Sequence, residues 1–143
     1  METLIIYGTK SGASAECAKL LTESIVGAKM IDIERAQPEL AKFERVIVGA
    51  GVRNDKMYKS IRDYLQKNQA ELLSKELACF LCQAKPQTTE AVIVASIPEA
   101  IRQTALAIMS FGGYKANWVP VSSEHKLKGI DQGKIAEFVG KLS

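Results

Sequence analysis

The chain has 143 residues, about the size of one average domain, which is enough to bury a core but too short for two domains. Hydrophobic residues make up 47% and charged residues 24%, and no apolar run approaches the roughly 18 residues that span a bilayer. Membrane-spanning and disordered classes are therefore excluded. The net charge of +3 comes from 19 basic and 16 acidic side chains that are interleaved along the chain, which argues against nucleic-acid binding.

The first residues do not resemble an export signal. Glu2 is acidic where a signal peptide carries basic residues, and the apolar run at 4–7 is too short. The cysteines number three, and an odd number without a secretory context predicts reduced thiols instead of a disulfide framework. We therefore expect a cytoplasmic protein.

Short apolar runs alternate with helical periodicity, which predicts a single α/β domain over residues 1–143 with a parallel sheet. The predicted strands are short and apolar or β-branched, and they lie at 3–7, 29–33, 45–51, 77–82 and 117–121. Helices are predicted between them from apolar spacings of three and four residues, at about 14–26, 58–72, 96–109 and 131–142. Five strands of this kind form a doubly wound sheet with helices on both faces, and 2-1-3-4-5 is a common strand order.

Two details of the second half depend on local signals. Residues 91–95 fit either a strand or a buried helical turn, because periodicity alone does not separate the two. Ser96 and Glu99 have the spacing of a capping box, which predicts that the next helix starts there. Pro120 cannot donate a backbone hydrogen bond, so the last strand is expected at the edge of the sheet or near its own end.

Ligands of such sheets bind beyond the carboxyl ends of the strands, at the switch point between the first and third strands. The loops at 8–14 and 49–57 meet there. The first of them combines two glycines, three hydroxyl residues and a following helix, so its N–H groups can converge on a phosphate. It is not a Walker loop and lacks GxGxxG. The two strands end in Gly8-Thr9 and Gly49-Ala50, without the acidic residues that a phosphoaspartate receiver needs.

Residues 9–14 resemble the phosphate loop of the flavodoxin family. With segments 46–53 and 79–82 and Phe111-Gly112-Gly113, they resemble the flavodoxin-domain branch that includes menaquinone-type protoporphyrinogen IX dehydrogenases. The resemblance implies a flavodoxin-like fold and FMN as the cofactor. It implies that the phosphate loop consists of Thr9, Lys10, Ser11, Gly12, Ala13 and Ser14. It also implies that the isoalloxazine is flanked by Ala50, Gly51, Val52, Arg53, Asn54 and Asp55 on one side and by Gln83, Ala84 and Lys85 on the other.

One departure from that branch concerns the loop after the third strand, where an aromatic residue followed by glycine is usual. This chain has Asn54-Asp55. Both residue types tolerate the left-handed conformation, so the shape of the loop is expected to survive without the stacking ring. Tyr58 lies in a periodic helix, and a core or helix-surface position is expected for it.

Several other residues have a structural explanation that we prefer. Cys79 and Cys82 have CxxC spacing, but on a strand positions i and i+3 face opposite sides, so two separate buried thiols are expected. His125 lacks a second ligand nearby, which argues against a metal site. Trp118 is expected to pack within a strand. The basic residues Arg53, Lys56, Lys59 and Arg62 are expected to form a solvated helix face. If FMN binds, Arg53 and Lys56 are also expected to border the flavin edge, because they follow the third strand at its carboxyl end.

No residue has the setting of a dedicated acid, base or nucleophile, so no catalytic residue is assigned. The expected function is that of an FMN-binding redox protein. It would pass electrons to a partner protein or a small-molecule acceptor, or oxidise a porphyrinogen or reduce a quinone as an enzyme. The alternative is a binding or regulatory module that has kept the fold with weak or lost FMN binding.

Overall fold

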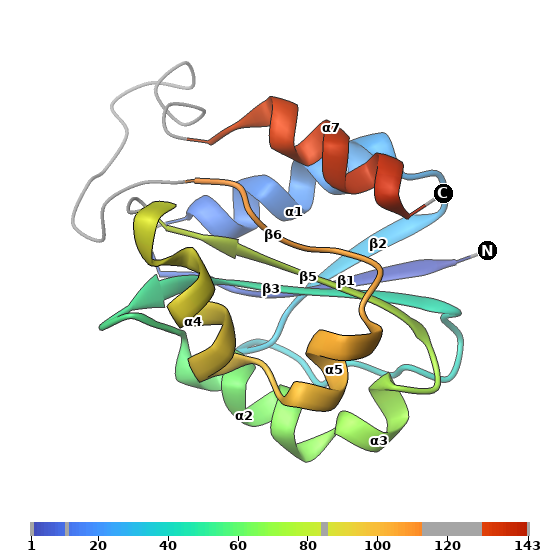
Figure 1. Cartoon of the computed structure of the whole chain (residues 1–143). Coiled ribbons are helices and arrows are strands. Elements are labelled where there is room, and N and C mark those ends of the chain that lie inside the picture. The colour runs from blue at the N-terminus through green and yellow to red at the C-terminus, as the bar shows by residue number, and fades with distance from the viewer. Residues whose placement is uncertain (1, 11, 84–85, 113–129, 143) are drawn as a thin grey trace.

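The computed structural model describes residues 2–10, 12–83, 86–112 and 130–142. Within them, a parallel sheet lies between two layers of helices (Figure 1). The parallel strands are β1 (Thr3–Gly8), β2 (Ala28–Asp32), β3 (Arg45–Arg53), β5 (Glu76–Cys82) and β6 (Ile108–Ser110), and β4 (Lys56–Met57) pairs with β3 in antiparallel orientation. The α-helices are α1 (Ala13–Ser24), α2 (Lys59–Lys67), α3 (Gln69–Leu72), α4 (Thr89–Ser96), α5 (Glu99–Thr104) and α7 (Gln132–Lys141), and a 3-10 turn covers Pro86–Thr88.

The sheet has the order β2-β1-β3-β5-β6, with β4 outside this path. Numbered by their sequence, the five parallel strands follow the predicted order 2-1-3-4-5, so the doubly wound, flavodoxin-like class is confirmed. The chain runs from β1 outward to β2 and then crosses back to β3 on the other side of β1. The switch point therefore lies between β1 and β3, as the sequence predicts.

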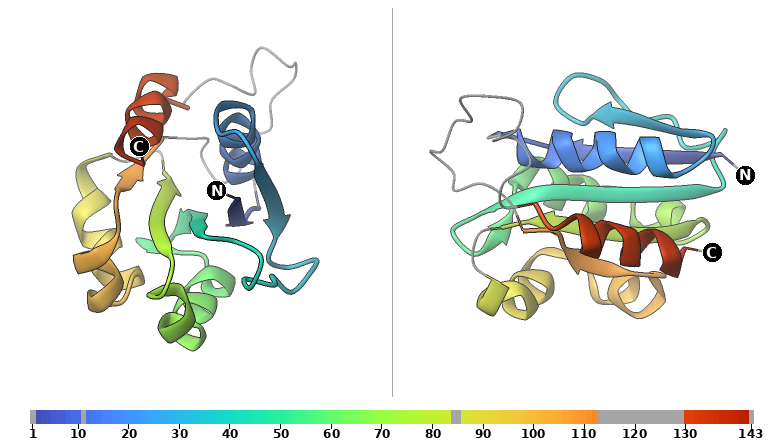
Figure 2. Two further views of the ribbon diagram at one scale, coloured as in Figure 1. Left: turned by 90° about the vertical axis from the view of Figure 1, so that its right-hand side faces the viewer. Right: turned by 90° about the horizontal axis from the view of Figure 1, so that it is seen from above.

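Successive side chains of each strand point to opposite faces of the sheet, which divides the core into two layers. One layer includes Leu4, Ile6, Val46 and Val48 and packs against α2, α3, α4 and α5. The other includes Ile5 and Ile47 and packs against α1 and α7. Figure 2 shows the sheet edge-on between these two sets of helices. The period of two in β1 and β3 explains why both strands are apolar throughout, because each face of the sheet is covered.

The register of the strands sets the height of the site. Gly8 pairs with Ala50, and Gly51 pairs with Cys82, so β1, β3 and β5 reach the same edge of the sheet. β3 then continues for two residues past Gly51 to Arg53. The strand predicted at 45–51 therefore extends to Val52 and Arg53, which were expected in the loop, because β4 pairs with these two residues.

The segment from Ser96 to Met109 differs from its prediction. A helix covers only Glu99–Thr104, and residues 108–110 form the edge strand β6, so the single helix to Met109 is wrong. The capping box is also wrong, since the Ser96 hydroxyl accepts a hydrogen bond from the Met57 N–H at 2.8 Å. Residues 91–95 are helical, within α4. The strand predicted at 117–121, with Pro120 and Trp118, lies outside the described residues, as does His125.

The C-terminal helix follows its prediction closely. Asp131 precedes α7, and its Oδ1 accepts a hydrogen bond from the Lys134 N–H at 3.0 Å, which caps the helix. Ile135 and Phe138 are buried against α1 and the sheet. Phe138 meets Phe111 edge to face at 5.1 Å between ring centroids, and this contact ties α7 to the end of β6.

Candidate functional site

The loop between β1 and α1 is held in a tight turn by Gly12. This glycine has φ 95 and ψ −8, and its N–H donates to the Thr9 hydroxyl oxygen at 3.0 Å. Its carbonyl accepts from the Glu16 N–H at 3.0 Å, which begins the hydrogen bonding of α1. A Cβ at position 12 would meet no atom within 4 Å, so glycine is needed here for its backbone conformation and not for space.

The start of α1 presents N–H groups and the Ser14 hydroxyl, and the first turn also contains the acidic residue Glu16. α1 has 12 residues, and no side chain in the described part of the chain caps its N-terminus. Ser14 is 1% exposed, and its hydroxyl has no hydrogen-bond partner among the described residues. Free N–H groups, the positive end of the helix dipole and an unsatisfied hydroxyl favour an oxyanion at this point. Ser11, the remaining hydroxyl residue of the predicted cradle, lies outside the described residues.

β3 and β4 form a hairpin with a two-residue turn at Asn54 and Asp55. Arg53 pairs with Lys56, and the two turn residues have φ 54 and 59. Positive φ at both positions is typical of the tight turns that match the twist of a hairpin. The expectation that Asn and Asp accept the left-handed conformation here is confirmed.

Tyr58 fills the space beneath this hairpin. It is 8% exposed and belongs to the core layer that faces α2, so the expectation of a core position is confirmed. A Cβ on Gly51 would lie 2.6 Å from the Tyr58 hydroxyl oxygen, so only glycine leaves room for the ring. Burial raises the pKa of the Tyr58 hydroxyl, and the nearby Arg53 guanidinium opposes part of that rise.

Both backbone groups of Met57 are fixed by side chains. Its N–H donates to the Ser96 hydroxyl oxygen at 2.8 Å, and its carbonyl accepts from Arg62 Nε at 2.8 Å. The Tyr58 N–H also donates to the Gly51 carbonyl at 3.1 Å. The base of the hairpin is thus anchored to α4 through Ser96, to α2 through Arg62 and to its own strand.

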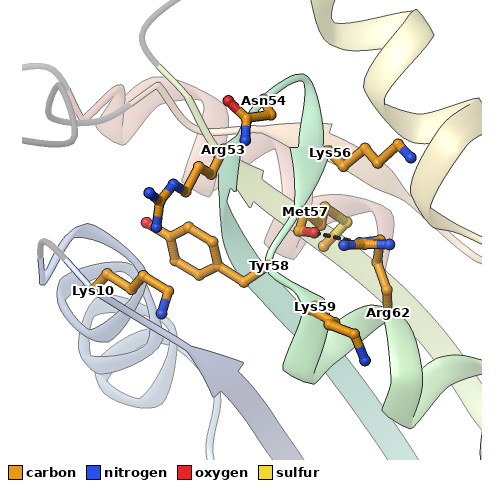
Figure 3. A pocket seen from close by; sticks show the side chains of 8 residues that line it. All are labelled: Lys10, Arg53, Asn54, Lys56, Met57, Tyr58, Lys59 and Arg62. Carbon is orange, nitrogen blue, oxygen red and sulfur yellow. Dashed lines mark hydrogen bonds between the residues drawn. The ribbon is translucent and has the colours of Figure 1, made fainter.

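A cavity of about 480 Å³ opens beside the hairpin (Figure 3). We call it the basic pocket, and its lining residues are Lys10, Arg53, Asn54, Lys56, Met57, Tyr58, Lys59 and Arg62. Five of these eight side chains are cationic. The prediction that the basic residues form a solvated helix face is wrong, because Arg53 and Lys56 lie on strands and only Lys59 and Arg62 on a helix.

Lys10 joins the phosphate loop to the basic pocket. Its Nζ lies 5.5 Å from the centroid of the Tyr58 ring, within the range of a cation–π contact. Figure 3 shows the Tyr58 ring between Lys10 and Arg53. The contribution of Lys10 was not apparent from the sequence, because 48 positions separate Lys10 from Tyr58 and only the β1–β3 pairing brings them together.

The third segment of the predicted site begins at Gln83, directly after β5. Gln83 is buried, and its Nε2 donates to the Thr88 hydroxyl oxygen at 2.8 Å, which closes this loop onto the start of α4. Ala84 and Lys85 lie outside the described residues. The described part of the site thus brings together loop 9–14, the end of β3 and the end of β5.

The cysteines lie under the site and are all buried and free. Cys79 and Cys82 belong to different core layers, as their spacing on a strand predicts. Cys82 instead meets Cys17 of α1, with 3.4 Å between the two sulfurs. The hydrogen bond from Cys82 and burial together raise the pKa of the Cys17 thiol. Burial raises the pKa of Cys79 to about 12.

The described residues contain neither a metal-binding cluster nor a membrane-spanning helix. No group of three or more His, Cys, Asp or Glu side chains is placed to hold a metal ion within residues 2–10, 12–83, 86–112 and 130–142. Over the same part of the chain, no helix has the length and apolar character needed to cross a membrane.

The strand order, together with a glycine and hydroxyl loop before a helix N-terminus at the switch point, defines a flavodoxin-like α/β protein. A family model described as a flavodoxin domain matches residues 4–117. The chain therefore belongs to the flavodoxin-domain family.

Among curated proteins, the chain is similar to the protoporphyrinogen IX dehydrogenase [quinone] of Escherichia coli strain K12. The two are 25% identical over 95 residues, which cover 61% of this chain and 52% of that protein. The chain thus spans about half the length of the curated relatives it matches.

Solved structures with the same fold include an oxidised flavodoxin from Bacillus cereus, with a TM-score of 0.64 and 19% identity over 99% of this chain and 97% of that one. A flavoprotein from Lactobacillus acidophilus NCFM, crystallised in complex with FMN, has a TM-score of 0.60 and 13% identity over 76% and 92% of the two chains. At these identities the likeness is one of fold.

Proposed function

We propose that this chain binds FMN and acts as a flavodoxin-like redox protein. The observation that carries the proposal is the cradle at the start of α1, where the turn at Gly12 precedes a helix N-terminus without a side-chain cap among the described residues. The buried Ser14 hydroxyl supplies a polar atom that a phosphate oxygen would satisfy. The family, and the FMN complex of a protein with the same fold, support this choice of ligand.

In this proposal the phosphate is held by loop 9–14, and the isoalloxazine is flanked by residues 50–55 and 83–85. FMN would supply the redox chemistry, since it accepts and returns electrons. The protein would set the position of the flavin and its electrostatic surroundings. The Arg53 guanidinium at the end of β3 would favour a negatively charged reduced flavin. The Tyr58 hydroxyl would remain protonated at neutral pH, because the ordinary tyrosine pKa of 10.0 is already far above neutral pH and burial raises the pKa of this group further.

The finer proposal concerns the reaction. We infer either electron transfer to a partner protein or small-molecule acceptor, or oxidation of a porphyrinogen with a quinone as acceptor. The second reaction is supported only by similarity to a relative that carries this activity in its name and that is twice as long as the matched region. A cytoplasmic location remains part of the proposal.

A second function is favoured by the hairpin turn. Asn54 and Asp55 carry no ring, and the nearest aromatic side chain in the basic pocket, Tyr58, is buried beneath Gly51. A flavodoxin-fold module with weak or lost FMN binding would have this arrangement. The two proposals differ in one measurable quantity, the dissociation constant for FMN.

Titrating ligand-free protein into FMN, with flavin fluorescence as the readout, tests the proposal directly. We expect saturable quenching at micromolar protein. Ser14→Ala should weaken FMN binding by about tenfold to a hundredfold, because a hydrogen bond to a charged group contributes about 1.5–3 kcal/mol. Riboflavin lacks the phosphate, so its affinity should be unchanged by the same substitution.

The matched control is Ser74→Ala, which removes an exposed hydroxyl that donates to the Glu71 carbonyl, away from the site. It should leave both affinities unchanged. Absence of quenching at micromolar protein would favour the module without flavin. Equal losses for FMN and riboflavin in Ser14→Ala would move the phosphate away from loop 9–14. Turnover of a porphyrinogen with a quinone by the FMN-loaded protein would decide between the two redox proposals.

A further inference from the structure

The basic pocket has a lining of one charge sign. Its eight lining residues include five cations and no carboxylate. Its volume of about 480 Å³ falls within the range of about 300–1,000 Å³ that is usual for small-molecule pockets. The chain as a whole carries charges of mixed sign, with 19 basic and 16 acidic residues. A concave surface of uniform sign in such a chain calls for a ligand of the opposite sign.

The cations of the pocket are mostly not neutralised by the protein. Lys59 forms an ion pair with Asp63 at 2.6 Å. Among the residues described, neither Lys10, Arg53, Lys56 nor Arg62 has an ion-pair partner within 4.0 Å. The like charges around this cavity repel each other. An anionic ligand would offset that repulsion by its attraction to each cation.

Two of these cations are held in place. Arg62 Nε donates to the Met57 carbonyl, which fixes the guanidinium while leaving its terminal nitrogens available for an oxyanion. Lys10 Nζ is held over the Tyr58 ring. The base of the hairpin is fixed through the bond from the Met57 N–H to Ser96, so the wall that carries Lys56 is also positioned before a ligand arrives. Such preorganisation reduces the entropic cost of binding.

The pocket differs in chemistry from the phosphate loop. The cradle at Gly12 and Ser14 offers N–H groups and a hydroxyl, whereas the pocket offers charged side chains from three other elements, β3, β4 and α2. Among the described residues of loop 9–14, Lys10 alone lines the pocket. Because Lys59 is paired with Asp63, a single phosphate in the cradle leaves three cations of the pocket, Arg53, Lys56 and Arg62, without an anion.

We propose that the basic pocket binds a small organic or inorganic anion that carries at least two negative charges as carboxylate or phosphate groups. Lys10 and Arg53, on either side of the Tyr58 ring, hold one group, and Lys56 and Arg62, which lie next to Met57, hold another (Figure 3). This binding does not depend on the proposal that the chain binds FMN. When FMN is present, the anion lies beside the flavin site, because Lys10 borders both.

NMR titration of the ¹⁵N-labelled chain separates the two sites. The Nε–H of Arg62 reports on the pocket, and the backbone N–H of Gly12 reports on the phosphate loop. The probes are inorganic pyrophosphate and citrate, added at constant ionic strength to the ligand-free chain and to the chain with FMN. We expect saturable shifts of the Arg62 Nε–H in both forms, and the tighter of the two probes identifies the preferred group.

Substitutions test the role of the cations. Arg62→Gln and Arg53→Gln should each weaken the tighter probe at least fivefold, while Arg62→Lys, which keeps the charge, should retain part of the affinity. Arg53 is exposed, so its substitution leaves the fold intact. The matched control is Lys67→Gln, which removes a cation from the last turn of the same helix α2, outside the pocket. The affinity of Lys67→Gln for the tighter probe should stay within twofold of the affinity of the unsubstituted chain.

Three results would overturn the proposal. The first is a set of Arg62 shifts that are linear in probe concentration and equal to those caused by sodium chloride. The second is an unchanged affinity in Arg53→Gln. The third is saturable binding of polyglutamate without saturable binding of either small anion, which would mark the surface as a docking site for an acidic protein. A chain that takes no FMN but gives saturable Arg62 shifts would refute the flavin proposal and leave the anion pocket standing.

Discussion

The phosphate loop and the β3–β4 hairpin lie side by side at one edge of the sheet, yet they are equipped for anions in opposite ways. The loop uses a turn at Gly12, the N-terminus of α1 and a buried hydroxyl, all without net charge. The hairpin uses Arg53 and Lys56, which lie on either side of its two-residue turn, and Arg62 and Lys10 face the same cavity. Fixed dipoles are selective for shape and weakly affected by salt, whereas exposed cations attract over a distance and are screened.

The comparison teaches that one edge of a sheet can divide anion recognition into two functions. Buried N–H groups and a hydroxyl suit a ligand that stays bound. Exposed lysine and arginine side chains suit a ligand or partner that comes and goes, because long-range attraction raises the rate of encounter. The following predictions test whether the two regions are as different in stability and salt response as their chemistry implies.

The largest expected effect concerns the buried thiols beneath the two regions. We call the contact between Cys17 and Cys82 the floor of the site. Cys17 lies under the phosphate loop on α1, and Cys82 ends β5 beneath the hairpin, with their sulfurs in contact. We expect all three thiols to react with a thiol reagent at least about a thousandfold more slowly in the native protein than in urea, because reaction requires opening of the core. Rapid native labelling of Cys17 or Cys82 would show that the floor opens locally and that the two regions are not built on one rigid base.

The same burial predicts the direction of the alkaline response. The pKa of Cys79 is raised from 9.0 to about 12, and that of Tyr64 from 10.0 to about 12, both first of all by burial. The unfolded chain therefore releases these protons at lower pH than the native chain does. The free energy of unfolding should fall as pH rises from 9 toward 12. Urea unfolding at pH 8, 9 and 10 measures this, and a flat profile would contradict the burial of both groups.

The next effect distinguishes the glycines of the two regions. Gly51→Ala places a Cβ against the Tyr58 ring, and overpacking of this kind costs about 1–3 kcal/mol of stability. Gly12→Ala meets no atom but forces alanine to a positive φ, at a cost of about 1–2 kcal/mol. Urea unfolding gives both values. The Arg62 Nε–H resonance should shift in Gly51→Ala and stay in place in Gly12→Ala, and the reverse pattern would mean that the two regions are coupled.

The anchor of the hairpin should have an effect of about 1–3 kcal/mol. Ser96→Ala leaves the buried Met57 N–H without its partner, and an unsatisfied buried donor costs about that much. The control is Thr104→Ala, which removes an exposed hydroxyl that donates to the Ala100 carbonyl and should change stability by less than about 0.5 kcal/mol. If Ser96→Ala were as mild as the control, the hairpin would not depend on α4. The hydrogen bond to Ser96 would then not preorganise the wall of the basic pocket.

The two regions also differ in how far the sequence reveals them. Loop 9–14 is a local pattern of glycine and hydroxyl residues between a strand and a helix, so its position could be predicted from spacing alone. The parallel, doubly wound sheet was predictable because apolar runs and helical periodicity alternate, and its order is a common one for five strands, but the fifth strand among the described residues is β6 at Ile108–Ser110 and not the segment predicted at 117–121. The basic pocket was not, since it joins Lys10 to residues more than forty positions away through the pairing of β1 with β3.

The errors on the segment 96–110 have a physical cause as well. Ser96 and Glu99 show the spacing of a capping box, but the Ser96 hydroxyl is already bonded to the N–H of Met57, which lies 39 residues earlier. The edge strand at 108–110 has only three residues, which is too short for a period of two to be separated from a helix. Tertiary partners, and not local preference, decide both features.

The smallest expected effect is at the tip of the hairpin, where two non-glycine residues hold positive φ. Asp55→Gly creates Asn-Gly, the pair best suited to this turn, and should stabilise the protein by about 0.5 kcal/mol after the added freedom of the unfolded chain is subtracted. Asp55→Ala should instead destabilise it, because alanine is strained at that φ. Both substitutions remove the same negative charge beside Arg53 and Lys56, so both should strengthen pyrophosphate binding slightly. Stability values of opposite sign with anion affinities of equal sign would show that backbone conformation and charge act independently at the hairpin, whereas parallel changes in both quantities would mean that the turn controls the pocket.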